Sequence, residues 1–205
     1  MINLIWDLDG TLIDSYPVFL ESLEAVFEHH HLPFDQKAVN QTIKKKSVNA
    51  LLEQQQVGFE LLKHEFTMVS KTKNDKITLM PGAKAVLEWT KQSGVRNFIY
   101  THKGKNAFDL LDQLEISGFF EEVVTSDHGF KRKPDPEGIQ YLLQKYHLNR
   151  QETYYVGDRS LDIEAAQQAL VSSINFIEHP YSIKIDQLTD LIDYFNDKRI
   201  KEHNE

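Results

Sequence analysis

The sequence has no cysteine among its 205 residues. This absence excludes thiol catalysis, disulfide frameworks and metal sites ligated by cysteine. Nine glycines and six prolines make up about 7% of the chain, against a usual combined share of about 12%, which excludes fibrous and low-complexity classes. No hydrophobic run approaches the length of about 18 residues that a membrane span requires, and the first ten residues lack the features of a signal peptide. The sequence therefore predicts a cytoplasmic protein without a membrane partner.

Basic residues are also in deficit. Lysine and arginine together number 23 against 31 aspartates and glutamates, so the formal net charge at pH 7 is −8. A polyphosphate backbone repels such a surface, and nucleic acid is not an expected partner. A chain of this length buries about 70% of the surface that its unfolded form exposes, which suffices for a hydrophobic core without disulfides or a structural metal.

Short apolar runs bounded by polar residues, glycine or proline predict five buried strands. They are Ile2 to Trp6, Val95 to Thr101, Glu122 to Thr125, Thr153 to Val156 and Ser173 to Ile177. Helical patterns alternate with the later strands, at Ala83 to Gln92, Asn106 to Leu114, Pro136 to Tyr146 and Ser160 to Leu170. Such alternation favours an α/β fold in which helices cover both faces of a parallel sheet and a site crevice lies at the carboxyl ends of the strands.

Residues 15–80 break this alternation. Four stretches there, at about 16–30, 35–45, 47–56 and 59–73, have helical patterns, and no strand pattern separates them. They predict an inserted helical lobe, with Asp35 and Ser47 as N-caps of its second and third helices. A last amphipathic helix is expected from Ile185 to Arg199.

Asp7 and Asp9 follow the first apolar run directly, in the segment Asp7-Leu-Asp-Gly-Thr11. In extended backbone, residues two apart point to the same side, so the two carboxylates converge. Close negative charges raise each other's pKa unless a cation lies between them. The pair therefore indicates a metal ion, a shared proton or a division of roles between base and nucleophile.

A second acidic pair, Asp158 and Asp162, follows the predicted strand at Thr153 to Val156. As an isolated feature, it is equally consistent with capping of the next helix, because acidic groups are favoured at helix N-termini. In a parallel sheet, however, Asp158 would emerge at the same edge as Asp7. Oxygen ligands gathered at one place suit Mg²⁺.

Thr101 ends one predicted strand, and Lys133 lies in the loop between another strand and the helix that follows it. A hydroxyl and an ammonium group are therefore expected in the same crevice. Together with the metal, they would bind the non-bridging oxygens of a phosphoryl group and neutralise its charge.

Four segments resemble, in order, the four motifs of the haloacid dehalogenase-like superfamily, and the resemblance is to its phosphoglycolate-phosphatase-like subgroup. They are Asp7 to Ser15, Thr101, Lys133 to Pro136 and Gly157 to Asp162. The resemblance extends over nearly the whole chain. It implies a Rossmann-like core at residues 1–14 and 81–205, with an α-helical cap inserted at 15–80.

The resemblance also implies roles for the acidic residues. Asp7 would be the nucleophile that forms an aspartyl-phosphate, which replaces one difficult displacement by two easier ones. Asp9 would protonate the leaving oxygen and then deprotonate the attacking water. The Asp7 carboxylate, the Asp9 backbone carbonyl and Asp158 would hold Mg²⁺, and Asp162 would support these ligands and Lys133.

Two positions depart from the family's pattern. His102 follows Thr101 where asparagine is common. We expect it to offer its side chain and its backbone N–H to phosphate and to alter substrate fit or pH dependence near neutrality. Ala169-Leu170 stands where relatives often have a small residue followed by glycine, a change that affects packing more than chemistry.

The function predicted from these residues is Mg²⁺-dependent hydrolysis of a small phosphorylated metabolite. Two alternatives remain: a phosphomutase or phosphotransferase with the same aspartyl-phosphate, and a catalytically silent binding or regulatory protein. Pro17 stands where hexose-phosphate mutases of the superfamily tend to have histidine, which favours hydrolysis. Dehalogenation is disfavoured because dehalogenases lack an aspartate at the position of Asp9.

His29-His30-His31 resembles a metal-binding tract. Three adjacent residues at a helix end cannot all face one ion. The tract is therefore interpreted as ordinary surface.

Overall fold

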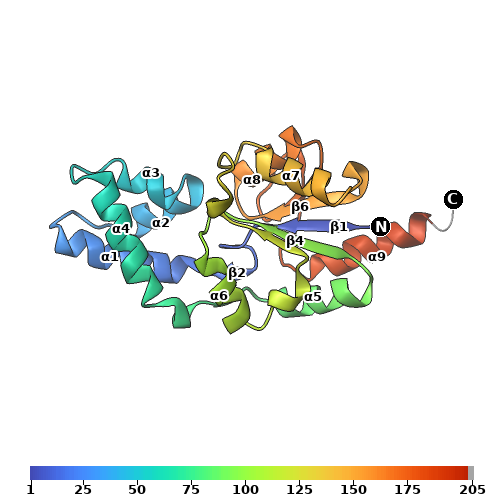
Figure 1. The fold of residues 1–205 in the computed structure, drawn as a ribbon, viewed down its shortest axis with the longest axis horizontal. Coiled ribbons are helices and arrows are strands. Elements are labelled where there is room, and N and C mark those ends of the chain that lie inside the picture. Colours follow the sequence, from blue (N-terminus) through green and yellow to red (C-terminus); the bar gives the residue numbers. More distant parts are fainter. Residues whose placement is uncertain (203–205) are drawn as a thin grey trace. The chain divides into compact units, whose positions relative to one another are not determined.

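The computed structural model describes residues 1–202 and divides the chain into two compact units. The sheet unit contains Met1–Ile13 and the chain from Leu79 onward, and the helical unit contains Asp14–Thr78 (Figure 1). Among the described residues, no helix combines the length and the hydrophobicity that a membrane crossing needs.

Six parallel strands form the main sheet, in the order β5-β4-β1-β6-β7-β8. Their bounds are β1 Asn3–Trp6, β4 Arg96–Tyr100, β5 Glu122–Val124, β6 Thr153–Gly157, β7 Ser172–Asn175 and β8 Ser182–Lys184. β1 lies at the centre, where Ile5 pairs with Phe98 of β4 and Tyr155 of β6. The parallel sheet confirms the predicted fold class. A separate two-stranded sheet joins β2 (Ile13–Asp14) and β3 (Thr78–Leu79).

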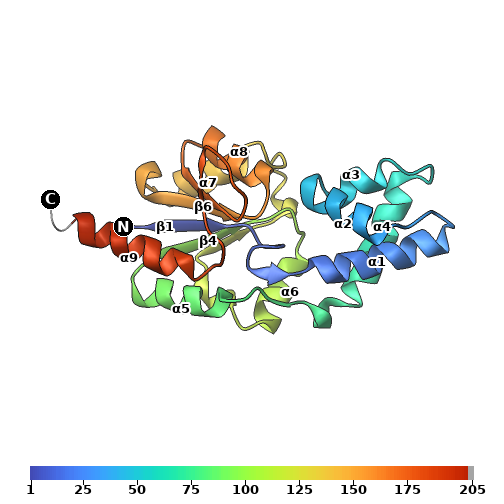
Figure 2. The same cartoon turned by 180° about the vertical axis from the view of Figure 1, so that it is seen from behind.

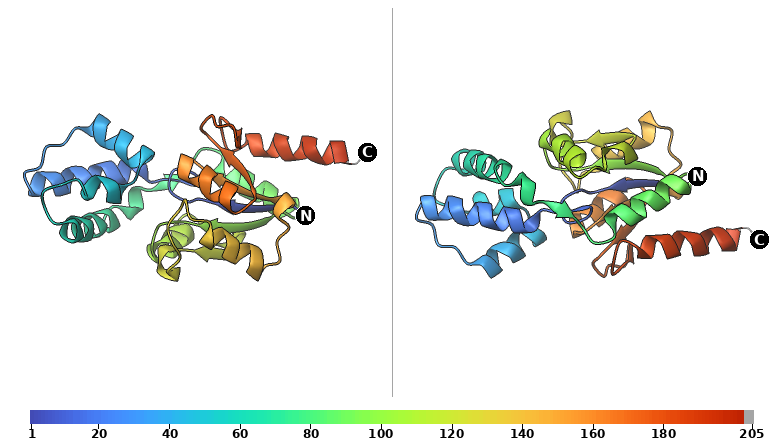
Figure 3. Two further views of the ribbon diagram at one scale, coloured as in Figure 1. Left: turned by 90° about the horizontal axis from the view of Figure 1, so that it is seen from above. Right: turned by 90° about the horizontal axis from the view of Figure 1, so that it is seen from below.

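Helices cover both faces of this sheet (Figures 1 and 3). α7 (Glu137–Lys145) and α8 (Ser160–Gln168) cover one face, where Ile139 and Ala165 share a hydrophobic cluster with Ile5 and Tyr155. Figure 3 shows these helices, in gold and orange, from above. Because strand side chains alternate, Trp6 points to the opposite face from Ile5.

The opposite face is covered by α5 (Ala83–Gln92) and α9 (Asp190–Glu202). Trp89 of α5 stacks on Phe195 of α9 at a ring-centroid distance of 6.0 Å, and Phe195 also meets Tyr154 of β6 edge-on at 4.9 Å. α6 (Asn106–Gln113) connects β4 to β5. All four helices predicted between residues 83 and 170 are therefore present.

The last helix begins later than predicted. Ile185 donates its backbone N–H to Asn175 at 3.0 Å, so it continues the sheet edge at β8 instead of starting a helix. The Asp190 carboxylate then accepts the N–H groups of Asp186 and Gln187, which turns the chain into α9. The expected start at Ile185 is wrong, because Ile185 still bonds to β7 and the preceding strand, Ser182-Ile-Lys184, is too short to leave an alternating pattern in the sequence.

The helical unit contains α1 (Tyr16–His29), α2 (Gln36–Lys45), α3 (Val48–Leu52) and α4 (Phe59–Lys71), which Figure 2 shows from behind. Its own core includes Leu23, Phe27, Ile43, Leu52 and Leu62. Both predicted N-caps are confirmed. The Asp35 carboxylate accepts the Ala38 N–H and the Ser47 hydroxyl accepts the Ala50 N–H, each at 3.0 Å.

Among the described residues, α1, α6, α7 and α8 end without glycine in the same motif that α5 forms with Gly94. The residue after the C-cap has a left-handed φ of 52 to 58°, and it is His31, Glu115, His147 or Leu170. The next residue is hydrophobic and donates its N–H back across the last turn, as Val171 does to Ala166 at 3.0 Å. This is the Schellman ending, in which glycine is the usual left-handed residue. Other residue types at these ends account for part of the low glycine content.

Candidate active site

Asp7 occupies the first position after β1. Its N–H donates to the Val156 carbonyl at 2.8 Å, which extends the ladder between β1 and β6 by one residue. The chain then turns sharply: Gly10 has φ 82°, and the Leu8 carbonyl accepts the N–H groups of Leu12 and Ile13. Asp7 is 2% exposed. The buried carboxylate of Asp7 therefore lies at the carboxyl edge of the sheet.

Lys133 connects the Asp7 carboxylate to a second acidic residue. Its side chain is fully buried, and Nζ lies 2.8 Å from Asp7 Oδ1 and 2.7 Å from Asp162 Oδ1. Nζ also donates to the Tyr155 hydroxyl at 2.9 Å. An ammonium group has three hydrogens, so all three are engaged. The buried charge is therefore fully paired, as burial of an ion requires.

For Asp7 and for Lys133, burial and the neighbouring opposite charge shift the pKa in opposite directions. Burial raises the pKa of Asp7 above its ordinary value, although the charge of Lys133 works against that rise. Burial also works to lower the pKa of Lys133, but the Asp162 and Asp7 carboxylates outweigh it, and the pKa lies above its ordinary value. Lys133 is therefore charged at neutral pH. Burial raises the pKa of Tyr155 well above its usual range, so its hydroxyl stays neutral and donates to the Tyr100 carbonyl at 2.9 Å.

Asp162 holds the start of α8 against this cluster. Its Oδ2 accepts the N–H groups of Asp158 at 3.3 Å and Arg159 at 3.1 Å, while its Oδ1 accepts from Lys133. A Cβ at Gly157 would lie only 2.6 Å from the Asp162 side chain. Glycine is therefore necessary where β6 ends, because the Asp162 carboxylate packs against the backbone there. Asp162 therefore caps the start of α8 and also contacts Lys133.

The acidic residues form a group with the chemistry of a metal site. One carboxylate oxygen from each of Asp7, Asp158 and Asp162 lies within 4.8 Å of the others. Asp7 Oδ2 is buried, and among the described residues it has no hydrogen-bond partner. Buried polar atoms normally have a partner, and a hard divalent cation prefers carboxylate oxygens. The residues present therefore fit such a cation.

Comparison with known proteins supports one family. The family model described as haloacid dehalogenase-like hydrolase matches residues 4–176. The chain belongs to this family.

A phosphoglycolate phosphatase from Yersinia pestis is 31% identical over 181 residues, which cover 82% of this chain and 77% of that protein. One from Pseudomonas putida is 27% identical over 183 residues, with 83% and 67% covered.

Two solved structures share the fold. A HAD-superfamily hydrolase from Geobacter sulfurreducens superposes with a TM-score of 0.78 at 18% identity, and the match covers 95% of this chain and 96% of that one. A hydrolase from Streptococcus pneumoniae gives a TM-score of 0.66 at 30% identity, covering 93% and 97%. The first likeness, at such low identity, is one of fold alone.

In this family member, Thr101 and His102 begin the loop after β4. The Thr101 N–H donates to the Val124 carbonyl at 2.9 Å, and its hydroxyl accepts the Lys103 N–H at 3.1 Å. His102 Nε2 accepts the backbone N–H of Lys133 at 2.7 Å. The histidine thus ties the loop after β4 to the segment that carries Lys133. This contact had no signal in the sequence.

The protonation of His102 follows from that hydrogen bond. Burial holds the pKa of His102 far below its ordinary value, and the positive charges of Lys133 and Arg132 lower it further. The ring is therefore neutral near pH 7. Because Nε2 is the acceptor, the ring hydrogen belongs on Nδ1. Nδ1–H is the donor that the ring retains for another group.

Two further residues of the site were not among the expected ones. Lys103 Nζ lies 3.0 Å from Asp9 Oδ1, and the Lys103 side chain is only 8% exposed. Tyr155 lies within a core-like apolar run, so its contact with Lys133 was hidden by the strand pattern. The position of Lys103, two residues after Thr101 at a strand end, weakly indicates a place in the site.

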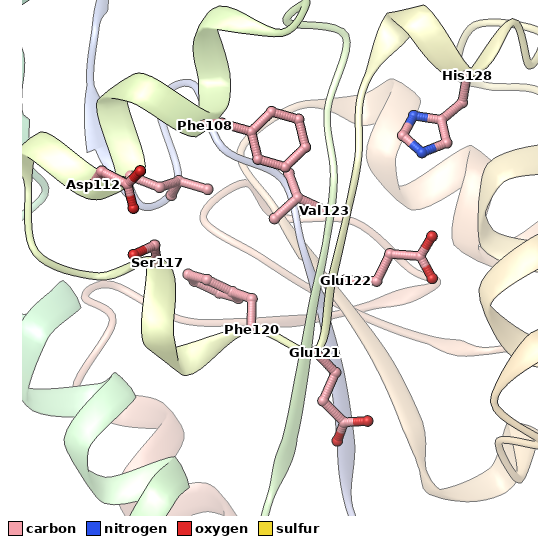
Figure 4. Close-up of a pocket in the computed structure, with 9 residues that line it drawn as sticks. Phe108, Asp112, Ser117, Phe120, Glu121, Glu122, Val123 and His128 are labelled. Atoms are coloured by element: carbon pink, nitrogen blue, oxygen red, sulfur yellow. The ribbon is translucent and has the colours of Figure 1, made fainter.

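A pocket of about 410 Å³ lies elsewhere in the sheet unit, beside β5 (Figure 4). The residues that line it include Phe108 of α6, Phe120, Val123 and His128. None of the expected site residues lines this pocket. The candidate active site is the polar cluster around Asp7 and not this hollow.

Proposed function

We propose that the chain is a phosphatase that hydrolyses a small phosphate monoester through an aspartyl-phosphate on Asp7, with Mg²⁺ as cofactor. The observation that carries the proposal is the state of the Asp7 carboxylate. One oxygen is held by Lys133 at 2.8 Å, and the other is buried without a hydrogen-bond partner among the described residues. The relatives named phosphoglycolate phosphatase support a small phosphorylated substrate.

In the proposed first step, an Asp7 carboxylate oxygen attacks the phosphorus, and the bond to the leaving oxygen breaks. Asp9 donates a proton to that oxygen, and Lys103, 3.0 Å from Asp9 Oδ1, holds the carboxyl group in place. In the second step, water attacks the aspartyl-phosphate, Asp9 takes its proton, and the Asp7 carboxylate is restored. Without Asp9, both proton transfers would depend on solvent.

Thr101 and Lys133 would stabilise the transferred group. The Thr101 hydroxyl accepts from Lys103, which leaves its own hydrogen for a phosphoryl oxygen. Lys133 contributes positive charge beside Asp7, where it offsets charge on the transferred group. Because all three of its hydrogens are engaged, direct contact with the substrate requires exchange of one of these bonds.

Asp7, Asp158 and the Asp9 backbone carbonyl would hold Mg²⁺. The ion would reduce repulsion between the anionic nucleophile and the anionic substrate. Asp162, which already binds Lys133 and two backbone N–H groups, supports this arrangement as a positioning residue.

The helical unit would act as a cap that excludes water and selects the leaving group. On this proposal, residues 15–80 form the cap, and residues 1–14 and 81–205 form the catalytic core. A cytoplasmic location and the absence of a nucleic-acid partner stay predictions.

Phosphate release from a panel of small phosphate esters, with and without Mg²⁺, tests the proposal. We expect Mg²⁺-dependent turnover that Asp7→Asn abolishes and Asp9→Asn reduces strongly. Transfer of the phosphoryl group to a sugar hydroxyl would favour a mutase. Stoichiometric phosphorylation without turnover would favour a regulatory protein.

A further inference from the structure

A second group of metal-ligating side chains lies in the helical unit. His29 Nδ1 lies 3.2 Å from Glu65 Oε2, and His30 Nε2 lies 2.8 Å from the same oxygen. The three ligand atoms all lie within 4.8 Å of one another. Glu65 comes from α4, more than thirty residues away in the chain, so the sequence did not connect it with the histidines.

Two of the three spacings in this group are close to those of ligands around one small ion, and the third, between the two ring nitrogens, is within 4.8 Å. Bonds of about 2.0–2.2 Å in tetrahedral geometry place neighbouring ligand atoms about 3.3 Å apart. The separations of 3.2 and 2.8 Å at Glu65 Oε2 are close to this value. An ion at this place would replace the two hydrogens that the imidazoles now share with the carboxylate, and these hydrogens would leave as protons.

The backbone holds the two imidazoles in this arrangement. Helix α1 ends in a Schellman motif, in which Leu32 donates to the Phe27 carbonyl at 2.8 Å and His31 donates to Glu28 at 3.1 Å. His31 takes the left-handed position, with φ 55°, and turns out of the helix. Two of the three adjacent histidines therefore converge, while the third leaves. The interpretation of this tract as ordinary surface considered the three histidines alone, without Glu65 from another helix.

Packing between helices fixes the third ligand. α1 and α4 share the hydrophobic core of the helical unit through Phe27 and Leu62. Glu65 follows Leu62 by three residues, so it lies on a neighbouring part of the same helix face. The side chains of His30 and Glu65 are 16% and 24% exposed. This partial burial limits their motion and still leaves access for an ion.

We propose that His29, His30 and Glu65 bind a divalent transition metal such as Zn²⁺, which joins the end of α1 to α4. Imidazole ligands suit zinc, nickel, copper and cobalt, whereas Mg²⁺ prefers oxygen ligands alone. The two sites of the chain would therefore select different ions. Water would supply the remaining position around the metal.

The test uses the full chain with saturating Mg²⁺, which occupies the oxygen site, and Co²⁺ as the spectroscopic probe. We expect one equivalent of Co²⁺ to bind with the visible absorption of a nitrogen-ligated ion. His30→Gln and Glu65→Gln should each lower its affinity by more than about 100-fold, beyond the 10–100-fold loss typical of a residue that only supports a ligand. His31→Gln and His64→Gln are matched controls, because both residues are exposed neighbours outside the cluster.

A measurement on the wild-type protein avoids any question of variant folding. Zn²⁺ should shift the ring resonances of His29 and His30 and leave those of His31 and His64 unchanged. The proposal is overturned if wild type shows no nitrogen-ligated Co²⁺, if Glu65→Gln binds Co²⁺ as wild type does, or if the control variants lose as much affinity. None of these outcomes depends on phosphatase activity.

Discussion

Two clusters of ionisable side chains, one in each unit, differ in burial and in the chemistry of their ligands. In the sheet unit, the side chains of Lys133, Asp7 and Asp162 are between 0% and 2% exposed. In the helical unit, His29 is 71% exposed beside a Glu65 that is 24% exposed. Loss of one partner in the first cluster leaves a buried charge without compensation, whereas water can replace a partner in the second. The same kind of contact thus has a different energetic weight in the two units.

Removal of Lys133 should have the largest effect. Lys133→Ala would leave Asp7 and Asp162 buried without their cation, and we expect a loss of about 3–5 kcal/mol in the free energy of unfolding. Urea denaturation measures this loss. Lys145→Ala is the matched control, because Lys145 contacts Glu122 at a half-exposed position and should cost no more than about 1 kcal/mol. Equal losses in the two variants would contradict the contrast between buried and exposed pairs.

Gly157→Ala tests the close packing behind the buried cluster. The added Cβ would lie 2.6 Å from Asp162, so we expect a loss of about 1–3 kcal/mol in stability. Asp162 would shift, so phosphate release should also fall. A Cβ at Gly118 would meet nothing within 4 Å, and its φ is not left-handed, so Gly118→Ala should not destabilise the protein. The idea fails if Gly157→Ala keeps full stability and activity.

We expect His102 to make the free energy of unfolding depend on pH. Its pKa is lowered in the folded state but is about 6.5 in the unfolded chain. Below pH 6.5 the unfolded state therefore binds more protons than the folded state, so this contribution to stability is lost as pH falls, by up to about 1.4 kcal/mol per pH unit.

In His102→Asn, the contribution of the imidazole to the fall of unfolding free energy between pH 6.5 and pH 5 should be absent. The substitution should change stability less above pH 7.5. Urea denaturation of wild type and His102→Asn between pH 5 and pH 7.5 measures the free energy of unfolding. An unchanged slope in His102→Asn would mean that the ring is not the group responsible.

Leu170→Gly should have the smallest effect, and it should be stabilising. Leu170 is 73% exposed and ends α8 with φ 58°, in the same motif that places His29 and His30. A residue with a Cβ is less stable in left-handed backbone by about 1–2 kcal/mol. Glycine has no Cβ, so the substitution removes part of this strain. We expect a gain of about 1 kcal/mol, measured by urea denaturation. Gln167→Gly, inside the helix, should instead destabilise by about 1 kcal/mol.

The contrast between the clusters also explains what the sequence could predict. Asp7, Lys133 and Asp158 follow strands of one parallel sheet, so the alternation of strands and helices, which predicts such a sheet, was enough to expect them at one edge. The bond from Lys133 N–H to His102 Nε2 joins two loops 31 residues apart, and no local pattern encodes it. Glu65 and the histidines meet through the packing of α1 on α4, which depends on the tertiary fold. β8 was missed because its three residues, Ser182-Ile-Lys184, are too few to show a period.

The most direct test of the account asks whether the phosphoryl group passes through Asp7. An aryl phosphate, whose leaving group needs little help from Asp9, should phosphorylate Asp9→Asn and leave the intermediate trapped. Acid quenching followed by peptide mass spectrometry should place one phosphoryl group on Asp7. Turnover by wild type with no phosphoryl group on Asp7, or with one on a different residue, would contradict the proposed mechanism.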